Sequence, residues 1–183
     1  TFDAILVGYL GSLEAVKAAG EIIDRLLAPG GVAIVDPAMA DNGKLYSGFD
    51  EDYVRAIGSL AGKSDIILPN VTEAAILSGL PYQENIDINY VNQLLNGLNH
   101  PCAVLTGVDF DEDSTGIVLQ EGTVQHEYRH KRIGTGCHGT GDIFAAVFTG
   151  ALMQGKNTVN APAHWYGVKF EPLLPELMEM LGR

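Results

Sequence analysis

The sequence predicts an α/β fold, a three-layer αβα sandwich around a mostly parallel sheet. Short apolar runs without polar alternation recur along the chain, as strands that are buried on both faces require. Segments with helical spacing stand between these runs, which is the arrangement of successive βαβ units. With 183 residues, of which 46% are hydrophobic, the chain can bury one good core. We therefore expect a single domain over residues 1–183.

The first part of the chain alternates predicted strands with predicted helices. Residues 3–10 (DAILVGYL) form the first strand, and residues 12–27 have helical spacing with Ser12 as the N-cap. The later strands of this part are expected at 30–37, 65–70 and 102–107, and its later helices at 50–62, 71–79 and 88–98.

The pattern changes after the fourth strand. Residues 116–122 and 123–133 predict a β-hairpin that turns at Glu121-Gly122. A glycine-rich loop and an apolar helix over 142–154 follow. A second helix should come before the tail, and none is visible, so we expect a gap near 160–162. The chain begins with Thr1 rather than Met, and we expect it to be incomplete at the N-terminus.

Charge and cysteine content restrict the partners. The 23 acidic and 11 basic residues give a net charge of −12, without a Lys/Arg cluster, which argues against nucleic acid and anionic membranes. The sequence contains no uncharged apolar run that is long enough to predict a membrane span. The two cysteines lack C-x-x-C spacing, so the expected location is the reducing cytoplasm. A phosphate ligand would be held by backbone N–H groups, a metal and a few side chains.

Polar residues follow the carboxyl ends of the predicted strands. They are, in chain order, Gly8-Tyr9, Asp36, Asn70 with Glu73, and Thr106-Gly107, followed by the glycine-rich loop. In open α/β sheets, ligands bind outside the carboxyl ends of the strands. Parallel strands would bring all these residues to one edge, which predicts a site there.

The stretch GTGCHGTGD, residues 134–142, allows two interpretations. Gly134, Gly136 and Gly139 match the G-x-G-x-x-G of dinucleotide-binding proteins. That motif should close the first βαβ unit and have an acid about twenty residues later, whereas this loop lies near the end of the chain and residues 155–165 contain no acid. A helix N-terminus that follows glycines instead favours a phosphoryl group, because its N–H groups are unpaired and its dipole end is positive.

Asp142 has two interpretations as well. A first-turn acid is often a helix cap, but Thr140 could cap this helix equally well. Asp142 precedes a face with few other charges, and an acid at a buried helix start beside a phosphate cradle is suited to act as a general base. We therefore predict a catalytic role for Asp142.

Two acidic segments have residues that could bind a metal ion. Asp109, Asp111 and Asp113 are spaced as in a calcium-binding EF-hand, but Ser114 replaces its glycine and Gln120 its final glutamate, so a solvated loop is expected. Residues 36–46 (DPAMADNGKLY) predict either an Asn-Gly turn with exposed acids or acids that bind Mg²⁺ or water beside the phosphate cradle.

The segments DPAMADNGKLY, LPNVTEAAILSG and GTGDIFAA, in this order and spacing, resemble the pyridoxal kinases of the ribokinase-like superfamily. The resemblance covers nearly the whole chain, including the tail GVKFEPLLPELM. It implies ATP-dependent phosphorylation of the 5′-hydroxymethyl group of pyridoxal, pyridoxamine or pyridoxine by a cytoplasmic homodimer.

The resemblance also implies roles for individual residues. Asp142 would be the base, and the N–H groups of residues 139–142 the anion hole. Glu73 and Asp36 would serve Mg²⁺–ATP directly or through water. The other implied contacts are Asn70 beside these acids, Thr106 and Gly107 at the phosphates, Asp41 and Tyr46 near the phosphates and a monovalent cation, and Gly139, Thr140 and Gly141 in the anion hole.

The chain departs from the family pattern at three places, one of which is Ala40, where a glycine is usual. Leu68 stands where a threonine is usual, which bears on the monovalent cation. The family also begins with roughly two further βαβ units that carry contacts to the pyridine ring. The alternatives are a hydroxymethylpyrimidine kinase, a sugar or nucleoside kinase, and a ligand-binding relative without catalysis. The intact acids Asp142, Glu73 and Asp36 argue against the last.

Overall fold

The structure is a computed structural model that describes residues 1–132, 139–155 and 158. Its main sheet has the spatial order β1-β2-β5-β6-β7-β8 within the described residues. The strands are β1 (Phe2–Val7), β2 (Leu27–Val35), β5 (Ile66–Ile67), β6 (Cys102–Asp109), β7 (Ser114–Glu121) and β8 (Val124–Lys131). The first four in this order are parallel, and β7 and β8 are antiparallel to their neighbours. The predicted mostly parallel sheet is confirmed.

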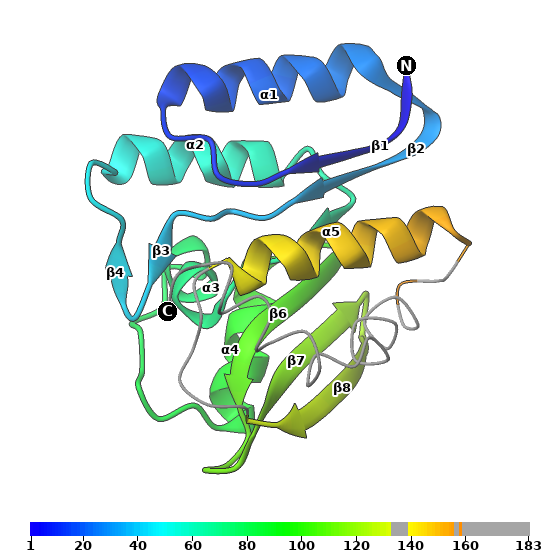
Figure 1. Ribbon diagram of the computed structural model, residues 1–183. Coiled ribbons are helices and arrows are strands. Elements are labelled where there is room, and N and C mark those ends of the chain that lie inside the picture. The colour runs from blue at the N-terminus through cyan, green and yellow to red at the C-terminus, as the bar shows by residue number, and fades with distance from the viewer. Residues whose placement is uncertain (133–138, 156–157, 159–183) are drawn as a thin grey trace, which may run out of the picture.

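Five helices flank this sheet in the described part of the chain (Figure 1). They are α1 (Leu13–Leu26), α2 (Glu51–Ala61), α3 (Val71–Ser78), α4 (Ile88–Leu98) and α5 (Thr140–Met153). Side-chain caps define the starts of α1 to α4: for example, Ser12, as predicted, accepts from the N–H of Ala15, and Asp50 accepts from that of Tyr53. Gly79 closes α3 in the left-handed conformation that a C-terminal glycine provides.

Alternating side chains of the strands enter two separate cores, which makes the fold three layers deep. Val35 and Leu105 pack with helices α1 to α4, whereas their neighbours Ile34 and Val104 pack with Phe148 of α5. This alternation follows from the period of two along a strand. Figure 1 shows α5 on the opposite side of the sheet from α1 and α2. The predicted αβα sandwich is therefore confirmed.

The structure differs from the sequence-based boundaries at several strands, and β1 for example ends at Val7 rather than at residue 10. β2 begins at Leu27 rather than residue 30, and its register with β1 shifts between Phe2 and Ala4. β5 contains only Ile66 and Ile67 instead of residues 65–70. Pro69 explains the early end, because proline has no N–H for the ladder. The pairing resumes as a single parallel bridge between Asn70 and Thr106.

A second, two-stranded sheet lies in the segment that was predicted as a polar loop. It consists of β3 (Ala40–Asp41) and β4 (Lys44–Leu45), joined by the Asn42-Gly43 turn. Asn42 has a φ of 50° and Gly43 one of 74°, and such positive values are typical of a tight hairpin turn. The predicted Asn-Gly turn is confirmed.

Several expectations lie outside the described residues: Gly134 and Gly136 of the glycine-rich loop, the tail, and the gap near 160–162. No helix in the described part of the chain has the length and apolar character needed to cross a membrane.

Candidate functional site

The carboxyl ends of the parallel strands lie next to one another, as the sequence predicts. The N–H of Asp36, just after β2, donates to the carbonyl of Val7 at the end of β1 at 2.8 Å. The N–H of Thr106 in β6 donates to the carbonyl of Pro69 at 2.9 Å. The residues that follow these strands therefore share one edge of the sheet.

The first turn of α5 faces this edge. A Cβ built on Gly141 would lie 4.0 Å from Oδ2 of Asp36, and one built on Gly8 would lie 3.9 Å from Oδ1 of Asp142. The cap position is Gly139, with a φ of 85° and no side-chain cap bond. The helical ladder begins with the bond from Ile143 N–H to the Gly139 carbonyl. The preceding N–H groups therefore point out of the helix end, where an anion can bind.

Asp142 lies in the first turn of α5, at the third helical position, and is not the cap. The expectation that it stands at a buried helix start is wrong, because Asp142 is exposed. Residues 139–142 at the start of α5 are all exposed, and burial of the helix begins at Phe144. Its carboxylate is thus accessible to a ligand.

Asp36 is a nearly buried carboxylate with a 9% exposed surface. Its Oδ1 accepts a hydrogen bond from the N–H of Ala38 at 3.2 Å. Burial raises the pKa of Asp36 to about 6, and the negative charge of Asp142 adds to this rise. Ionised Asp36 would therefore be stabilised by a cation at this edge.

Glu73 is still more deeply buried, at 2% exposure, and binds three backbone N–H groups. Its Oε1 accepts from Met39 at 2.9 Å and from Ala40 at 3.4 Å, and its Oε2 accepts from Asn70 at 2.9 Å. Burial raises the pKa of Glu73 to about 7, and the charge of Asp36 also raises it, against the lowering effect of these hydrogen bonds. A direct metal contact would have to compete with bonds already formed.

Asn70 connects two parts of the site. Its Oδ1 accepts from the N–H of Glu73 at 2.9 Å, which completes a capping box at the start of α3. Its Nδ2 donates to the carbonyl of Ala40 at 2.8 Å. Asn70 therefore fixes both the helix start and β3.

Asp41 and Tyr46 lie on the β3–β4 hairpin, close to the other acids. Asp41 is exposed and accepts from the N–H of Asn42 at 2.8 Å. Burial raises the pKa of Tyr46, and the charges of Glu73, Asp41, Asp36 and Asp142 raise it further. The Tyr46 hydroxyl thus lies within the field of every acid that the sequence assigns to the site.

Thr106 and Gly107 lie within β6, which continues to Asp109 rather than ending at residue 107 as predicted. The Thr106 hydroxyl donates to the carbonyl of Pro69 at 3.3 Å. Gly107 has a φ of 69° and interrupts the register with β7 between Thr106 and Val108. Leu68 is buried in the core on the α5 side of the sheet.

Sequence reasoning missed Thr72, whose hydroxyl accepts from the N–H of Gly43 at 3.0 Å. Thr72 is 3% exposed and stands in the first turn of α3 between two assigned residues. Its place beside Asn70 and Glu73 was a usable signal, but the partner lies 29 residues away and has no local signature.

The acids do not form a complete metal cage. The described residues contain no group of three or more His, Cys, Asp or Glu side chains that could hold a metal ion. Mg²⁺ in nucleotide sites usually takes one or two carboxylates and completes its shell with water and phosphate oxygens. Asp36 suits such a shared shell.

The acidic loop that follows β6 is organised by its own bonds. Asp111 accepts from the hydroxyl of Ser114 at 2.6 Å and from the N–H of Asp113 at 2.9 Å, and Arg132 pairs with Asp109 at 2.6 Å. This agrees with the expectation of a solvated loop.

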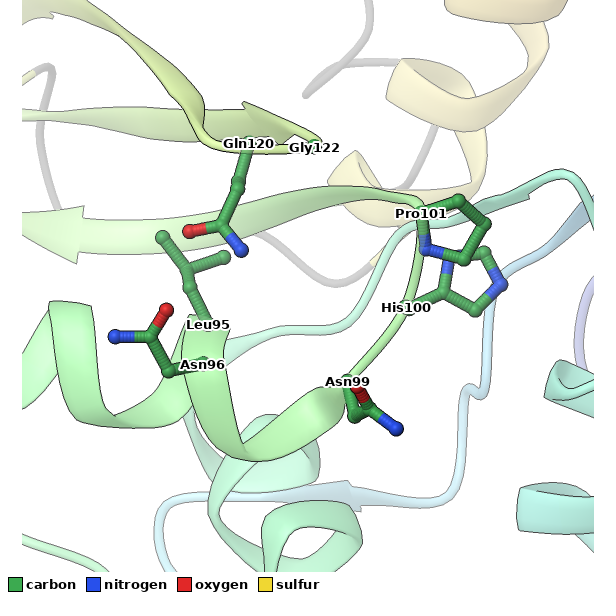
Figure 2. A pocket seen from close by; sticks show the side chains of 7 residues that line it. All are labelled: Leu95, Asn96, Asn99, His100, Pro101, Gln120 and Gly122. Atoms are coloured by element: carbon green, nitrogen blue, oxygen red, sulfur yellow. The ribbon is translucent and has the colours of Figure 1, made fainter.

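A hollow of about 290 Å³ lies elsewhere in the molecule (Figure 2). It is lined by Leu95, Asn96, Asn99, His100, Pro101, Gln120 and Gly122. Pro101 precedes β6 and Gly122 follows β7, so the hollow lies at the amino end of β6, away from Asp36 and Asp142.

The fold is that of the α/β small-molecule kinases. The sequence profile of the phosphomethylpyrimidine kinase family matches residues 1–164, and the chain belongs to this family. A pyridoxine/pyridoxal/pyridoxamine kinase of Bordetella avium is 30% identical over 171 residues, which are 86% of this chain and 55% of the relative.

Solved structures agree with this assignment. Pyridoxal kinase from Lactobacillus plantarum has a TM-score of 0.81 and 32% identity, covering 96% of this chain and 64% of that chain. Pyridoxal kinase from Staphylococcus aureus in complex with AMP-PCP and pyridoxal has a TM-score of 0.72 and 26% identity, with coverages of 87% and 57%. The resemblance to pyridoxal kinases is confirmed. The chain spans about half the length of the curated relatives it matches.

Proposed function

We propose that the protein is an ATP-dependent kinase that phosphorylates the 5′-hydroxymethyl group of pyridoxal, pyridoxamine or pyridoxine. The observation that carries the proposal is the approach of Asp142 and Asp36 around the glycine-led start of α5, at the carboxyl edge of the sheet. The relatives support the substrate class, since one is solved with pyridoxal and with AMP-PCP, an ATP analogue.

In this proposal Asp142 accepts the proton of the attacking hydroxyl. The hydroxyl oxygen then forms a bond to the γ-phosphorus of ATP, the bond from that phosphorus to the β,γ-bridging oxygen breaks, and ADP leaves. The N–H groups of Gly139, Thr140, Gly141 and Asp142 form the anion hole for the phosphoryl oxygens. Positioning and charge stabilisation dominate phosphoryl transfer, so a helix terminus and one base suit it.

Bound Mg²⁺ would neutralise charge on the nucleotide phosphates. Asp36 is the carboxylate best placed to meet its shell, and Glu73 would act through water because its oxygens bind N–H groups. Thr106 and Gly107 would contact phosphates at the same edge, with Asn70 beside the acids. Asp41 and Tyr46 would face the phosphates and a monovalent cation from the hairpin.

A hydroxymethylpyrimidine kinase is the second candidate, because the matching family is described as phosphomethylpyrimidine kinase. The complete protein should be assayed for ADP release with pyridoxal, pyridoxamine, pyridoxine and hydroxymethylpyrimidine in parallel. We expect a higher kcat/KM for a B6 vitamer. The opposite preference would favour the second candidate, and no turnover with any of them would favour a ligand-binding relative.

Native mass measurement tests the homodimer that the resemblance implies.

A further inference from the structure

The first turn of α3 holds the β3–β4 hairpin through side chains. The Thr72 hydroxyl accepts from the N–H of Gly43 at the hairpin tip at 3.0 Å. Glu73 accepts from the N–H of Met39 at the hairpin base at 2.9 Å. Both side chains are almost fully buried, at 3% and 2% exposure. The base and the tip of the hairpin are therefore fixed to one helix turn.

The hairpin carries two residues of the site. Asp41 precedes the turn and Tyr46 follows β4, where its N–H donates to the carbonyl of Met39 at 2.9 Å. A two-residue turn with positive φ at Asn42 and Gly43 leaves the tip little freedom to compensate for a lost bond. A shift of the tip would therefore move Asp41.

We propose that the first turn of α3 is a clamp and that Thr72 and Glu73 position the nucleotide through the β3–β4 hairpin, Glu73 in addition to its water-mediated role toward Mg²⁺. The clamp itself consists of bonds within the chain, and only its ligand, Mg²⁺–ATP, rests on the proposed function. Neither residue needs to touch the nucleotide.

The clamp and a metal site predict different effects on nucleotide binding when the Thr72 bond is removed. If Glu73 served only the metal, removal of the Thr72 bond would leave nucleotide binding unchanged, because the Thr72 hydroxyl binds the N–H of Gly43 and is not a proposed metal ligand. If the hairpin transmits the effect, loss of the Thr72 bond alone must weaken binding. Thr72 is therefore the residue to change.

The test uses Thr72→Val, Thr72→Ser and the control Thr149→Val in the complete protein. Thr149 lies in α5 and donates to the carbonyl of Ala145 at 2.8 Å, so its variant also removes one hydroxyl-to-backbone bond. Amide hydrogen exchange at Gly43 and the Kd for Mg²⁺–ATP are measured for each. In Thr72→Val we expect about tenfold faster exchange at Gly43 and about fivefold weaker binding.

Thr72→Ser keeps the hydroxyl and should restore both values, and Thr149→Val should change neither. At saturating nucleotide, kcat of Thr72→Val should stay within about twofold, because the clamp affects binding rather than the base. If the valine variant does not fold, Thr72→Ala repeats the test with a smaller side chain.

Unchanged exchange at Gly43, or faster exchange with unchanged affinity, would overturn the clamp. A wild-type protein that does not bind Mg²⁺–ATP would overturn it together with the proposed function. If affinity responds to Thr72 but no B6 vitamer is phosphorylated, the substrate proposal fails while the clamp is supported.

Discussion

Asp142 is the residue on which the proposed chemistry depends most directly. Asp142→Asn keeps the size of the side chain and leaves the N–H groups of the helix start in place. A positioned base contributes about 10²–10⁴ in rate, so we expect kcat to fall by that factor. The affinity for ATP and the melting temperature should stay nearly unchanged, because the cap is Gly139 and Asp142 is exposed. Steady-state kinetics, nucleotide titration and thermal unfolding measure the three quantities.

The matched variant is Asp142→Ala. Removing the acid from the first turn costs only about 0.5 kcal/mol through the helix dipole. The alanine variant should therefore lose activity as the asparagine variant does and melt close to the wild type. Near-normal turnover of Asp142→Asn would show that Asp142 is not the base.

Asp36 should give the metal-free protein an unusual pH dependence. Its pKa is raised from 3.8 to about 6 in the folded protein, so ionisation opposes folding. The stability that protonated Asp36 contributes is complete below pH 3.8 and is lost as the pH rises through 6. The loss amounts to about 3 kcal/mol in the free energy of unfolding.

Urea unfolding in EDTA between pH 4 and pH 7.5 tests this prediction. Asp36→Asn can still accept from the N–H of Ala38 but cannot ionise. The variant should gain stability relative to the wild type as the pH rises, since the other carboxylates titrate in both proteins. A stability difference that does not vary with pH would contradict the raised pKa.

At the scale of elements, local signals predicted most of the fold. Helix caps such as Ser12 and continuous apolar runs act over a few residues, and α4 was placed at 88–98 as observed. The β3–β4 hairpin was missed as a pair of strands because each strand has only two residues. β5 was predicted too long because its apolar run continues to Leu68, although Pro69 ends the ladder.

The close packing of β7 on β8 leaves no room for a side chain at Gly116, which can be tested by substitution. A Cβ at this position would lie 1.9 Å from the backbone carbonyl oxygen of Tyr128 in the paired strand. A backbone atom cannot yield without breaking the ladder, so Gly116→Ala should cost about 3 kcal/mol, the upper part of the overpacking range. Urea unfolding measures the loss.

Gly122→Ala is the matched control. Gly122 has a φ of 59° but open space around its Cβ, so this variant should cost only the left-handed strain, about 1–2 kcal/mol. Equal losses in the two variants would contradict the close packing of β7 on β8.

For the molecule as a whole, topology places the site and long-range bonds complete it. Parallel strands bring Asp36, Asn70 and Thr106 to one edge, and this convergence was predictable because Asp36 and Asn70 come after their strands and Thr106 lies in the last part of β6. The bonds from Met39 to Glu73 and from Gly43 to Thr72 join residues 34 and 29 positions apart. No periodicity or cap signal in the sequence encodes such pairs, so they appear only in the folded chain.

The net charge of −12 predicts how the protein responds to ions. Screening reduces self-repulsion, since the Debye length falls from about 30 Å at 0.01 M to about 8 Å at 0.15 M, so NaCl should raise the melting temperature. Because the Mg²⁺ shell at Asp36 is expected to be shared with nucleotide phosphate oxygens, MgCl₂ at equal ionic strength should add little without nucleotide. Mg²⁺–ATP should add several degrees, because a ligand at about 100 times its Kd stabilises by about 2.7 kcal/mol. Asp36→Asn should lose most of this increment and keep the response to NaCl. A rise with MgCl₂ alone beyond that with NaCl would instead reveal a cation site formed by the protein without nucleotide.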